Sequence, residues 1–181
     1  MGHGRSERVE QHFGCGEEKM MQKIQTRFGE VEYDPDNTLQ FPEGLVGFEG
    51  LRNFIVMPNE KEGPLFWIQS VEDPQVAFVL TDPTDFYFDY KVVPDSRERQ
   101  KLGISENDEC LVVSVVTVPQ DRNITLNLAA PILFAPSTNR DLQVVLEGTK
   151  FSPRTPLPKV CDGILTRADK PLRKGHSTGS L

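Results

Sequence analysis

The sequence predicts an all-β fold, either a small, partly open β-barrel or a closed sandwich, with one short helix on its surface. The first observation is that about eight to ten short runs, rich in β-branched and aromatic residues, are separated by turn signals. The second is that only one stretch, 94–102, has the start and stop signals of a helix. The third is the length of residues 23–151, which is enough to bury about two-thirds of the unfolded surface in one core.

The expected strands follow one another along this central part. A hairpin is predicted over 23–33, where Ile24, Thr26 and Phe28 share one face and Gly29-Glu30 forms the turn. Further strands are predicted at 52–58, 64–71, 74–81, 109–118, 123–128, 131–135 and 142–146. The run at 109–118 (ECLVVSVVTV) is apolar almost throughout, which is typical of a central strand buried on both faces.

The helix predicted over 94–102 (PDSRERQKL) has Asp95 or Ser96 as its N-cap and Gly103 after its end. Its charged residues leave no core-facing stripe beyond Leu102 and Ile104, so we expect it on the surface.

Composition divides the chain into three parts. Residues 1–22 have scarcely any apolar periodicity and predict a disordered extension. Whether translation starts at Met1 or at Met20 or Met21 stays open. Residues 23–151 form the β-domain and hold 11 Lys and Arg against 21 Asp and Glu, a net charge of -10. Residues 152–181 hold 6 basic and 2 acidic residues and several prolines, and predict a mostly disordered basic tail.

The segment Phe41 to Gly50 (FPEGLVGFEG) places three glycines in an apolar run. Its glycines allow positive φ or close backbone approach, while Phe41, Leu45, Val46 and Phe48 favour burial, so the segment predicts a buried corner between two strands. A phosphate-binding loop is the alternative. It is disfavoured because no long helix and no Lys-Ser or Lys-Thr pair follows.

Several classes of chemistry find no support in the residues of the central part. The three histidines, His3, His12 and His176, all lie in the terminal segments, and the three cysteines, Cys15, Cys110 and Cys161, form no Cys-x-x-Cys pair. We therefore predict no catalytic residues, no metal site and no cofactor. With no signal peptide and no long apolar run, the expectation is a cytoplasmic protein without a membrane span.

The negative charge of the central part bears on its partners. Nucleic-acid affinity comes mainly from Lys and Arg that neutralise phosphates, so we expect no direct binding of nucleic acid by the core. A basic protein partner suits this charge better.

Aromatic and acidic residues alternate between Asp82 and Tyr90 (DPTDFYFDY). The spacing of Asp82, Asp85 and Asp89 fits neither a calcium loop nor an acid and base pair, which favours a solvated acidic loop. The aromatic pairs of this segment and of Phe66-Trp67 also allow a base-stacking platform, but their acidic neighbours favour core packing instead.

Four motifs can now be set in order: FPEGLVGFEG at 41–50, PLFWIQS at 64–70, NLAAPI at 127–132, and QVVL at 143–146 followed by RTPL at 154–157. In this order and at these spacings the chain resembles the FliW family of bacterial flagellar assembly factors, over about residues 22–157. The positions that serve as the structural signature are Phe41, Gly44, Gly47, Phe48, Gln69, Ser70, Asn127 and Pro131.

The resemblance implies a compact, non-catalytic β-barrel that binds cytoplasmic flagellin and, alternately, the translational repressor CsrA. Export of flagellin would free the protein to capture CsrA and so relieve the block on flagellin messenger RNA. An acidic domain docked beside the basic RNA-binding surface of CsrA would repel phosphates without covering the site.

Two surface segments are candidates for these partners. For flagellin, Gln143, Val144, Val145 and Leu146 are expected to form the last strand and a sheet edge open to backbone pairing, with a plain core strand as the alternative. For CsrA, the candidates are Asp82, Asp85, Phe86, Phe88 and Asp89, with a solvated loop as the alternative. A second function class, a small β-barrel ligand binder or carboxylate-based hydrolase, stays open at this point.

Overall fold

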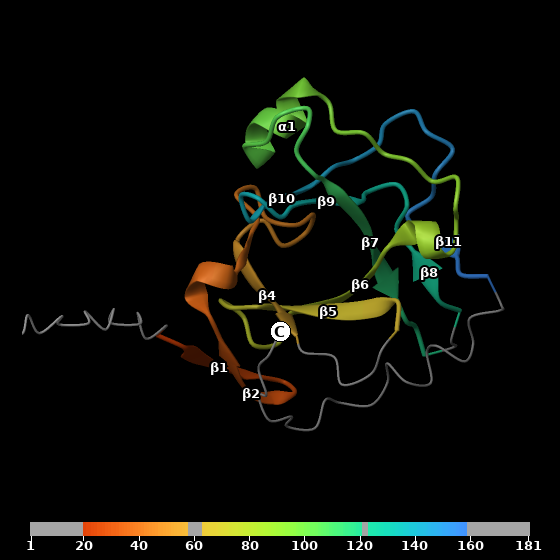
Figure 1. Ribbon diagram of the computed structural model, residues 1–181. Coiled ribbons are helices and arrows are strands. Elements are labelled where there is room, and N and C mark those ends of the chain that lie inside the picture. The colour runs from red at the N-terminus through yellow and green to blue at the C-terminus, as the bar shows by residue number, and fades with distance from the viewer. Residues whose placement is uncertain (1–19, 58–62, 121–122, 159–181) are drawn as a thin grey trace, which may run out of the picture.

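Seven strands close into a β-barrel in the computed structural model, which describes residues 20–57, 63–120 and 123–158 (Figure 1). The barrel strands are β3 (Leu39–Gln40), β4 (Asn53–Met57), β5 (Leu65–Ser70), β6 (Ala77–Thr81), β7 (Leu111–Thr117), β9 (Ile132–Ala135) and β10 (Arg140–Gln143). Neighbours β3 to β7 pair antiparallel along the chain, and the pairing of β7 with β9 closes the ring. The all-β class and the barrel predicted from the sequence are confirmed.

Two further strands lie outside the ring, beside β7. They are β8 (Thr125–Leu126), which pairs with β7, and β11 (Thr155–Pro156), which pairs with β8. The paired structure therefore extends past Phe151, where the β-domain was predicted to end. The prolines around β11 hid this strand, because proline is read as a strand breaker although it is tolerated at a sheet edge. Residues 1–19 and 159–181 of the two predicted terminal segments lie outside the described residues.

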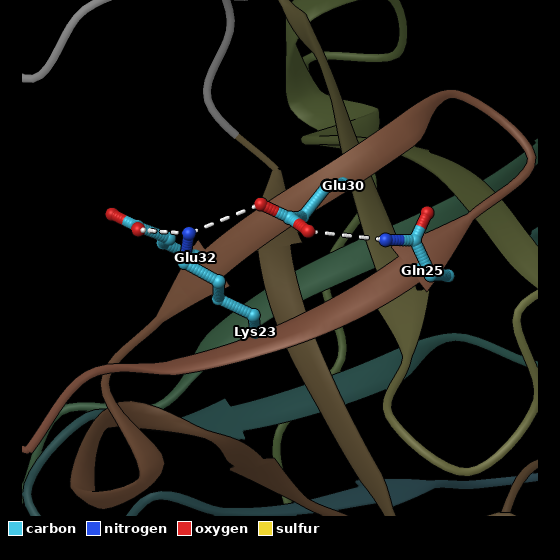
Figure 2. Close-up of polar contacts among 4 residues, drawn as sticks. All are labelled: Lys23, Gln25, Glu30 and Glu32. Atoms are coloured by element: carbon cyan, nitrogen blue, oxygen red, sulfur yellow. Dashed lines mark hydrogen bonds and ion pairs between the residues drawn. The ribbon is translucent and has the colours of Figure 1, made fainter.

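The N-terminal hairpin of β1 (Gln22–Thr26) and β2 (Gly29–Tyr33) covers the outer face of β4 and β5. Its turn is Arg27-Phe28, two residues before the predicted Gly29-Glu30, and Phe28 packs edge-on against Trp67 at 5.4 Å between ring centroids. The outer face of the hairpin is polar: Lys23 Nζ lies 3.1 Å from a carboxylate oxygen of both Glu30 and Glu32, and Gln25 also binds Glu30 (Figure 2). On this face one lysine bridges two glutamates, so the three charged groups keep a net charge of -1.

The helix α1 (Ser96–Leu102) lies on the outside of the barrel and packs against β10 (Figure 1). Asp95, one of the two predicted N-cap residues, caps the helix and forms a capping box with Glu98. Leu102 is buried against Leu133, Leu142 and Val144, so the short helix seals one side of β9 and β10. Two 3-10 turns, η1 (Pro35–Asn37) and η2 (Pro83–Asp85), occupy stretches expected to be loops.

The barrel interior is filled by aromatic and aliphatic side chains from every barrel strand except β10. The fully buried members of this cluster are Phe41, Phe54, Ile68, Leu80 and Ile132. Phe41 contacts both Phe54 and Phe134 edge-on, at 5.3 and 6.4 Å between ring centroids. Each such side chain contributes about 1.5 to 3 kcal/mol by leaving water.

Asp141 lies on β10, whose pairing with β3 is the shortest in the barrel. Strand β10 is parallel to β3 and shares one register pair with it, Arg140 with Gln40. The Asp141 carboxylate, 2% exposed, accepts a hydrogen bond from the backbone N–H of Ala135 on β9. The backbone N–H of Gln40 on β3 lies near the same carboxylate and donates to the Asn139 carbonyl at 2.9 Å, so the carboxylate lies between the two strands that flank its own. Its other oxygen, Oδ2, has no hydrogen-bond partner among the described residues.

Burial raises the pKa of Asp141 to about 7, although the two backbone N–H groups pull it down. The unfolded chain, with an ordinary aspartate pKa, holds fewer protons than the folded chain between about pH 4 and pH 7, so stability falls as the pH rises through this range. We expect the free energy of unfolding in urea to be about 1 kcal/mol lower at about pH 8 than at about pH 6.

Replacing Asp141→Asn should abolish that difference, whereas the exposed control Asp85→Asn should retain it. An Asp141→Asn variant that kept the full pH dependence would assign it to another group.

Candidate protein-docking surfaces

The glycine-rich segment 41–51 folds over one end of the barrel and inserts Phe41 and Leu45 into its core. Three tight turns build it: Gly44 N–H donates to the Phe41 carbonyl at 2.9 Å, Phe48 N–H to the Leu45 carbonyl at 2.7 Å, and Leu51 N–H to the Phe48 carbonyl at 3.0 Å. Gly47 is the third residue of the second turn and has φ +83°, which a type II turn requires at that position. The predicted structural corner is therefore present.

One part of that prediction is wrong. Val46 was expected to be buried, but it stands at the tip of the second turn with 61% of its surface exposed, and Phe48 is 39% exposed. The turn explains this, since its second residue projects away from the barrel. The sequence signal is Gly47, because a glycine at the third position of a type II turn places the preceding residue, Val46, at the second position.

The two glycines differ in the constraint they carry. Both have positive φ, but a Cβ on Gly44 would lie 2.6 Å from the Glu49 Cα, whereas a Cβ on Gly47 would meet nothing within 4 Å. We expect Gly47→Ala to lower the free energy of unfolding by about 1 to 2 kcal/mol through backbone strain alone. Gly44→Ala should cost clearly more, about 3 kcal/mol or above, because the backbone at Glu49 must move.

Urea unfolding of the two variants side by side measures this difference. Equal losses would show that the close approach of Gly44 to Glu49 relaxes without cost.

The flagellin candidate Gln143–Leu146 was predicted to be the last strand and a sheet edge. It is not the last strand, which is β11, and Gln143 ends β10, which lies between β3 and β9. Strand β3 pairs with β10 only at Arg140, so residues 144–146 are paired on one side. Beyond Gln143, Val144 N–H and Leu146 N–H donate to the carbonyls of Pro131 and Ala129. Backbone pairing thus continues on that side. The alternation leaves Val144 buried and Val145 62% exposed.

Gln143 ties the corner to the neighbouring strands. Its side-chain oxygen accepts a hydrogen bond from Val46 N–H at 2.8 Å, and its side-chain nitrogen donates to the Ala130 carbonyl at 3.0 Å. Asn127 Oδ1 accepts from Ala130 N–H at 3.0 Å. The amide of Gln143 is therefore a positioning group rather than a contact for a partner.

The other side of the corner is held by the turn after β5. Glu72 Oε1 accepts from Arg52 N–H and Asn53 N–H, while Gln69 Nε2 donates to the carbonyls of Asp73 and Val76. Ser70 Oγ accepts from the N–H groups of Glu72 and Asp73. Residues from the stretches 41–50, 64–70, 127–132 and 143–146 therefore contribute hydrogen bonds around the corner, whereas RTPL at 154–157 pairs with β8.

Comparison with known proteins addresses the same part of the chain. The family model described as FliW protein matches residues 22–157. The chain belongs to the FliW family.

Two FliW relatives and one solved structure show how far the similarity extends. The flagellar assembly factor FliW of Syntrophotalea carbinolica is 67% identical over 139 residues, which cover 77% of this chain and 99% of that protein. That of Moorella thermoacetica is 38% identical over 141 residues, which cover 77% and 89%. A crystal structure of the flagellar assembly factor FliW matches with a TM-score of 0.70 at 26% identity, over 77% of this chain and 99% of the other. The chain is thus a flagellar assembly factor of FliW type, with the β-barrel of that family.

The acidic candidate segment 82–90 lies on the side of the FliW barrel near β7 and β8. Phe86, Tyr87 and Tyr90 pack in a hydrophobic cluster with residues of β7 and β8. The Tyr90 hydroxyl donates to the Leu128 carbonyl at 2.9 Å. Burial raises the pKa of Tyr90 to about 12. Phe88 instead points into solvent with 88% of its surface exposed. Three aromatic residues of the segment thus pack against the barrel, and Phe88 projects from it.

The three aspartates of this segment also separate into two roles. All three are exposed, but Asp82 accepts from Thr84 N–H and caps η2, whereas Asp85 and Asp89 lie on either side of Phe88 along the chain. The stacking platform considered with Phe66-Trp67 is not formed, because Phe66 packs into the barrel interior and Trp67 lies under the N-terminal hairpin. Contact with a partner is therefore open to Asp85, Phe88 and Asp89.

Two shallow grooves accompany these surfaces. One of about 550 Å³ lies between 87–90 and 150–156 and includes Asp89 and Arg154, and one of about 650 Å³ lies beside α1. Across the described ranges, no group of three or more His, Cys, Asp or Glu residues could hold a metal ion. No helix within those ranges is long and apolar enough to cross a membrane.

The different burial of Phe86 and Phe88 has a measurable consequence. We expect Phe86→Ala to lower the free energy of unfolding by about 2 kcal/mol, because it removes part of a packed cluster. Phe88→Ala should change it by no more than about 0.5 kcal/mol, as is usual for an exposed side chain. Urea unfolding compares them, and a large loss with Phe88→Ala would place that ring in the core.

Proposed function

We propose that this flagellar assembly factor binds cytoplasmic flagellin and, alternately, the translational repressor CsrA, and so couples flagellin synthesis to flagellin export. Free flagellin occupies the protein; once flagellin has left the cell, the protein captures CsrA and translation of flagellin messenger RNA resumes. In this scheme the protein works in the cytoplasm by protein–protein contact. It catalyses no reaction and does not bind RNA itself.

The observation that carries the CsrA half of this proposal is the projecting Phe88 between two exposed carboxylates. An aromatic ring exposed to 88% is unusual for a residue without a partner, since large apolar side chains favour burial. Asp85 and Asp89 add negative charge at the same place, on a domain whose net charge over 23–151 is -10. A basic surface with an apolar pocket is the complementary partner.

The mechanism needs no overlap between the protein and the RNA on CsrA. A repressor that binds RNA through basic residues loses affinity when an acidic domain docks beside that surface, because the phosphates are repelled over about a Debye length. The acidic residues thus serve twice, first in steering the encounter and then in excluding RNA.

A charge-reversal pair tests the electrostatic part. We expect Asp85→Lys with Asp89→Lys to weaken CsrA binding about tenfold or more and to flatten its dependence on salt. The matched control, Glu106→Lys with Glu109→Lys, makes the same change in net charge at exposed positions beyond α1 and should leave most of the affinity intact. Calorimetric titration with purified CsrA at low and high salt measures both.

Two results would count against this account. If binding were insensitive to salt and to the first pair of changes, the electrostatic mechanism would fail. If both pairs weakened binding equally, total charge rather than the 82–90 segment would be responsible.

A further inference from the structure

The chain leaves the barrel beside the acidic segment 82–90. The Pro156 carbonyl of β11 accepts a hydrogen bond from the Tyr87 hydroxyl. The next residue, Leu157, and Tyr87 both pack against the hydrophobic cluster of β7 and β8. Residues 159–181, which we call the C-terminal segment, are therefore attached next to the acidic segment.

A shallow groove lies between this exit and the acidic segment. Asp89 and Tyr90 line it from the acidic segment, and Lys150, Arg154 and Pro156 line it from the end of the described chain. None of the three charged side chains forms an ion pair within the described ranges. The groove therefore carries both signs of charge, and each is open to a further contact.

The acidic segment adds an exposed ring and a second carboxylate next to the groove. Phe88, directly before Asp89, is 88% exposed, and Asp85 is exposed as well. Among the residues that the structure describes, Asp85 has no ion-pair partner either. We call the groove together with Asp85, Phe88 and Asp89 the exit surface. Its chemistry is complemented by a segment that carries Lys or Arg beside an apolar side chain.

The C-terminal segment has this composition. Residues 159–181 hold five Lys and Arg against two Asp, whereas residues 23–151 have a net charge of -10. Four of the five cations lie between Arg167 and Lys174, together with the apolar Leu172. The charges of the segment and of the domain it leaves are therefore opposite, and the attraction favours contact between them.

Attachment strengthens this attraction. A segment joined to the protein next to the surface it binds meets that surface at an effective concentration of about millimolar, so weak ion pairs suffice for contact. The chain between Pro158 and Lys170 spans up to about 40 Å when extended, so the basic residues reach the groove and the carboxylates beyond it.

We propose that residues 159–174 fold back onto the exit surface and place their Lys and Arg side chains against Asp85 and Asp89, so that the chain covers its own acidic segment. The contact is intramolecular, and salt weakens it because exposed charges are screened. A basic partner must displace the segment before it docks there, which makes the segment an internal competitor. This competition, unlike the contact, rests on the proposed function.

Carbodiimide cross-linking of the full chain detects the contact directly, because the reagent joins an amine to a carboxylate without a spacer. At low salt we expect cross-links from Lys170 or Lys174 to Asp85 or Asp89, and their loss at about 1 M salt, where the Debye length is about 3 Å. The control carboxylate is Glu106, which is also exposed but lies beyond α1. It should form fewer than about one tenth as many cross-links, because the segment is not attached beside it.

A matched pair of substitutions tests the role of charge while keeping the reactive lysines. We expect Arg173→Glu to reduce the cross-links to Asp85 and Asp89 about threefold or more, because it turns an attraction into a repulsion. The control Arg97→Glu makes the same change in net charge at an exposed position of α1 and should leave the cross-links unchanged. Arg173→Glu should also tighten CsrA binding about threefold, since less of the surface is occupied.

The cross-linking yields and a calorimetric titration with CsrA separate the outcomes. Equal yields at Glu106 and at Asp85 and Asp89 would overturn the proposal, as would cross-links that join two chains when ¹⁴N- and ¹⁵N-labelled protein are mixed. If Arg173→Glu reduced the cross-links but left CsrA affinity unchanged, the competition would be excluded. If the wild type bound no CsrA, the proposed function would fail, while the cross-links would still establish the contact.

Discussion

Closure of the barrel between β3 and β10 is the constraint on which the rest of the structure depends. The two strands share a single register pair, so side chains must supply what the backbone ladder does not. The Gln40 N–H donates to the Asn139 carbonyl across this junction, and the Asp141 side chain adds a hydrogen bond from the Ala135 N–H of β9, at the cost of burying a carboxylate. Because β3 leads directly into Phe41, this junction also fixes where the corner begins.

The corner in turn seals the end of the barrel that β3 and β10 bring together. Phe41 and Leu45 fill the interior from that end, and the close approach of Gly44 to Glu49 folds the segment back on itself. The turns that place Phe41 and Leu45 in the core leave Val46 and Phe48 at the surface.

Local sequence signals predicted several of the secondary-structure elements, but they did not predict which distant strands pair. The hairpin, the long strand β7 and the capped helix α1 each carry their own pattern, and all three are present. Strands β3 and β11 have only two residues each, too few for a period, and their partners lie far along the chain. The place of β10 between β3 and β9 was missed for the same reason, because the sequence around Gln143 cannot show which strands flank it.

The acidic segment 82–90 and the corner are joined through the short segment 128–131. Tyr90, which anchors the acidic segment, donates to the Leu128 carbonyl, and the next two carbonyls, of Ala129 and Ala130, accept from Leu146 N–H and the Gln143 side chain. The Gln143 side chain also accepts from the Val46 N–H of the corner. One short stretch of backbone therefore positions both the acidic segment and the corner.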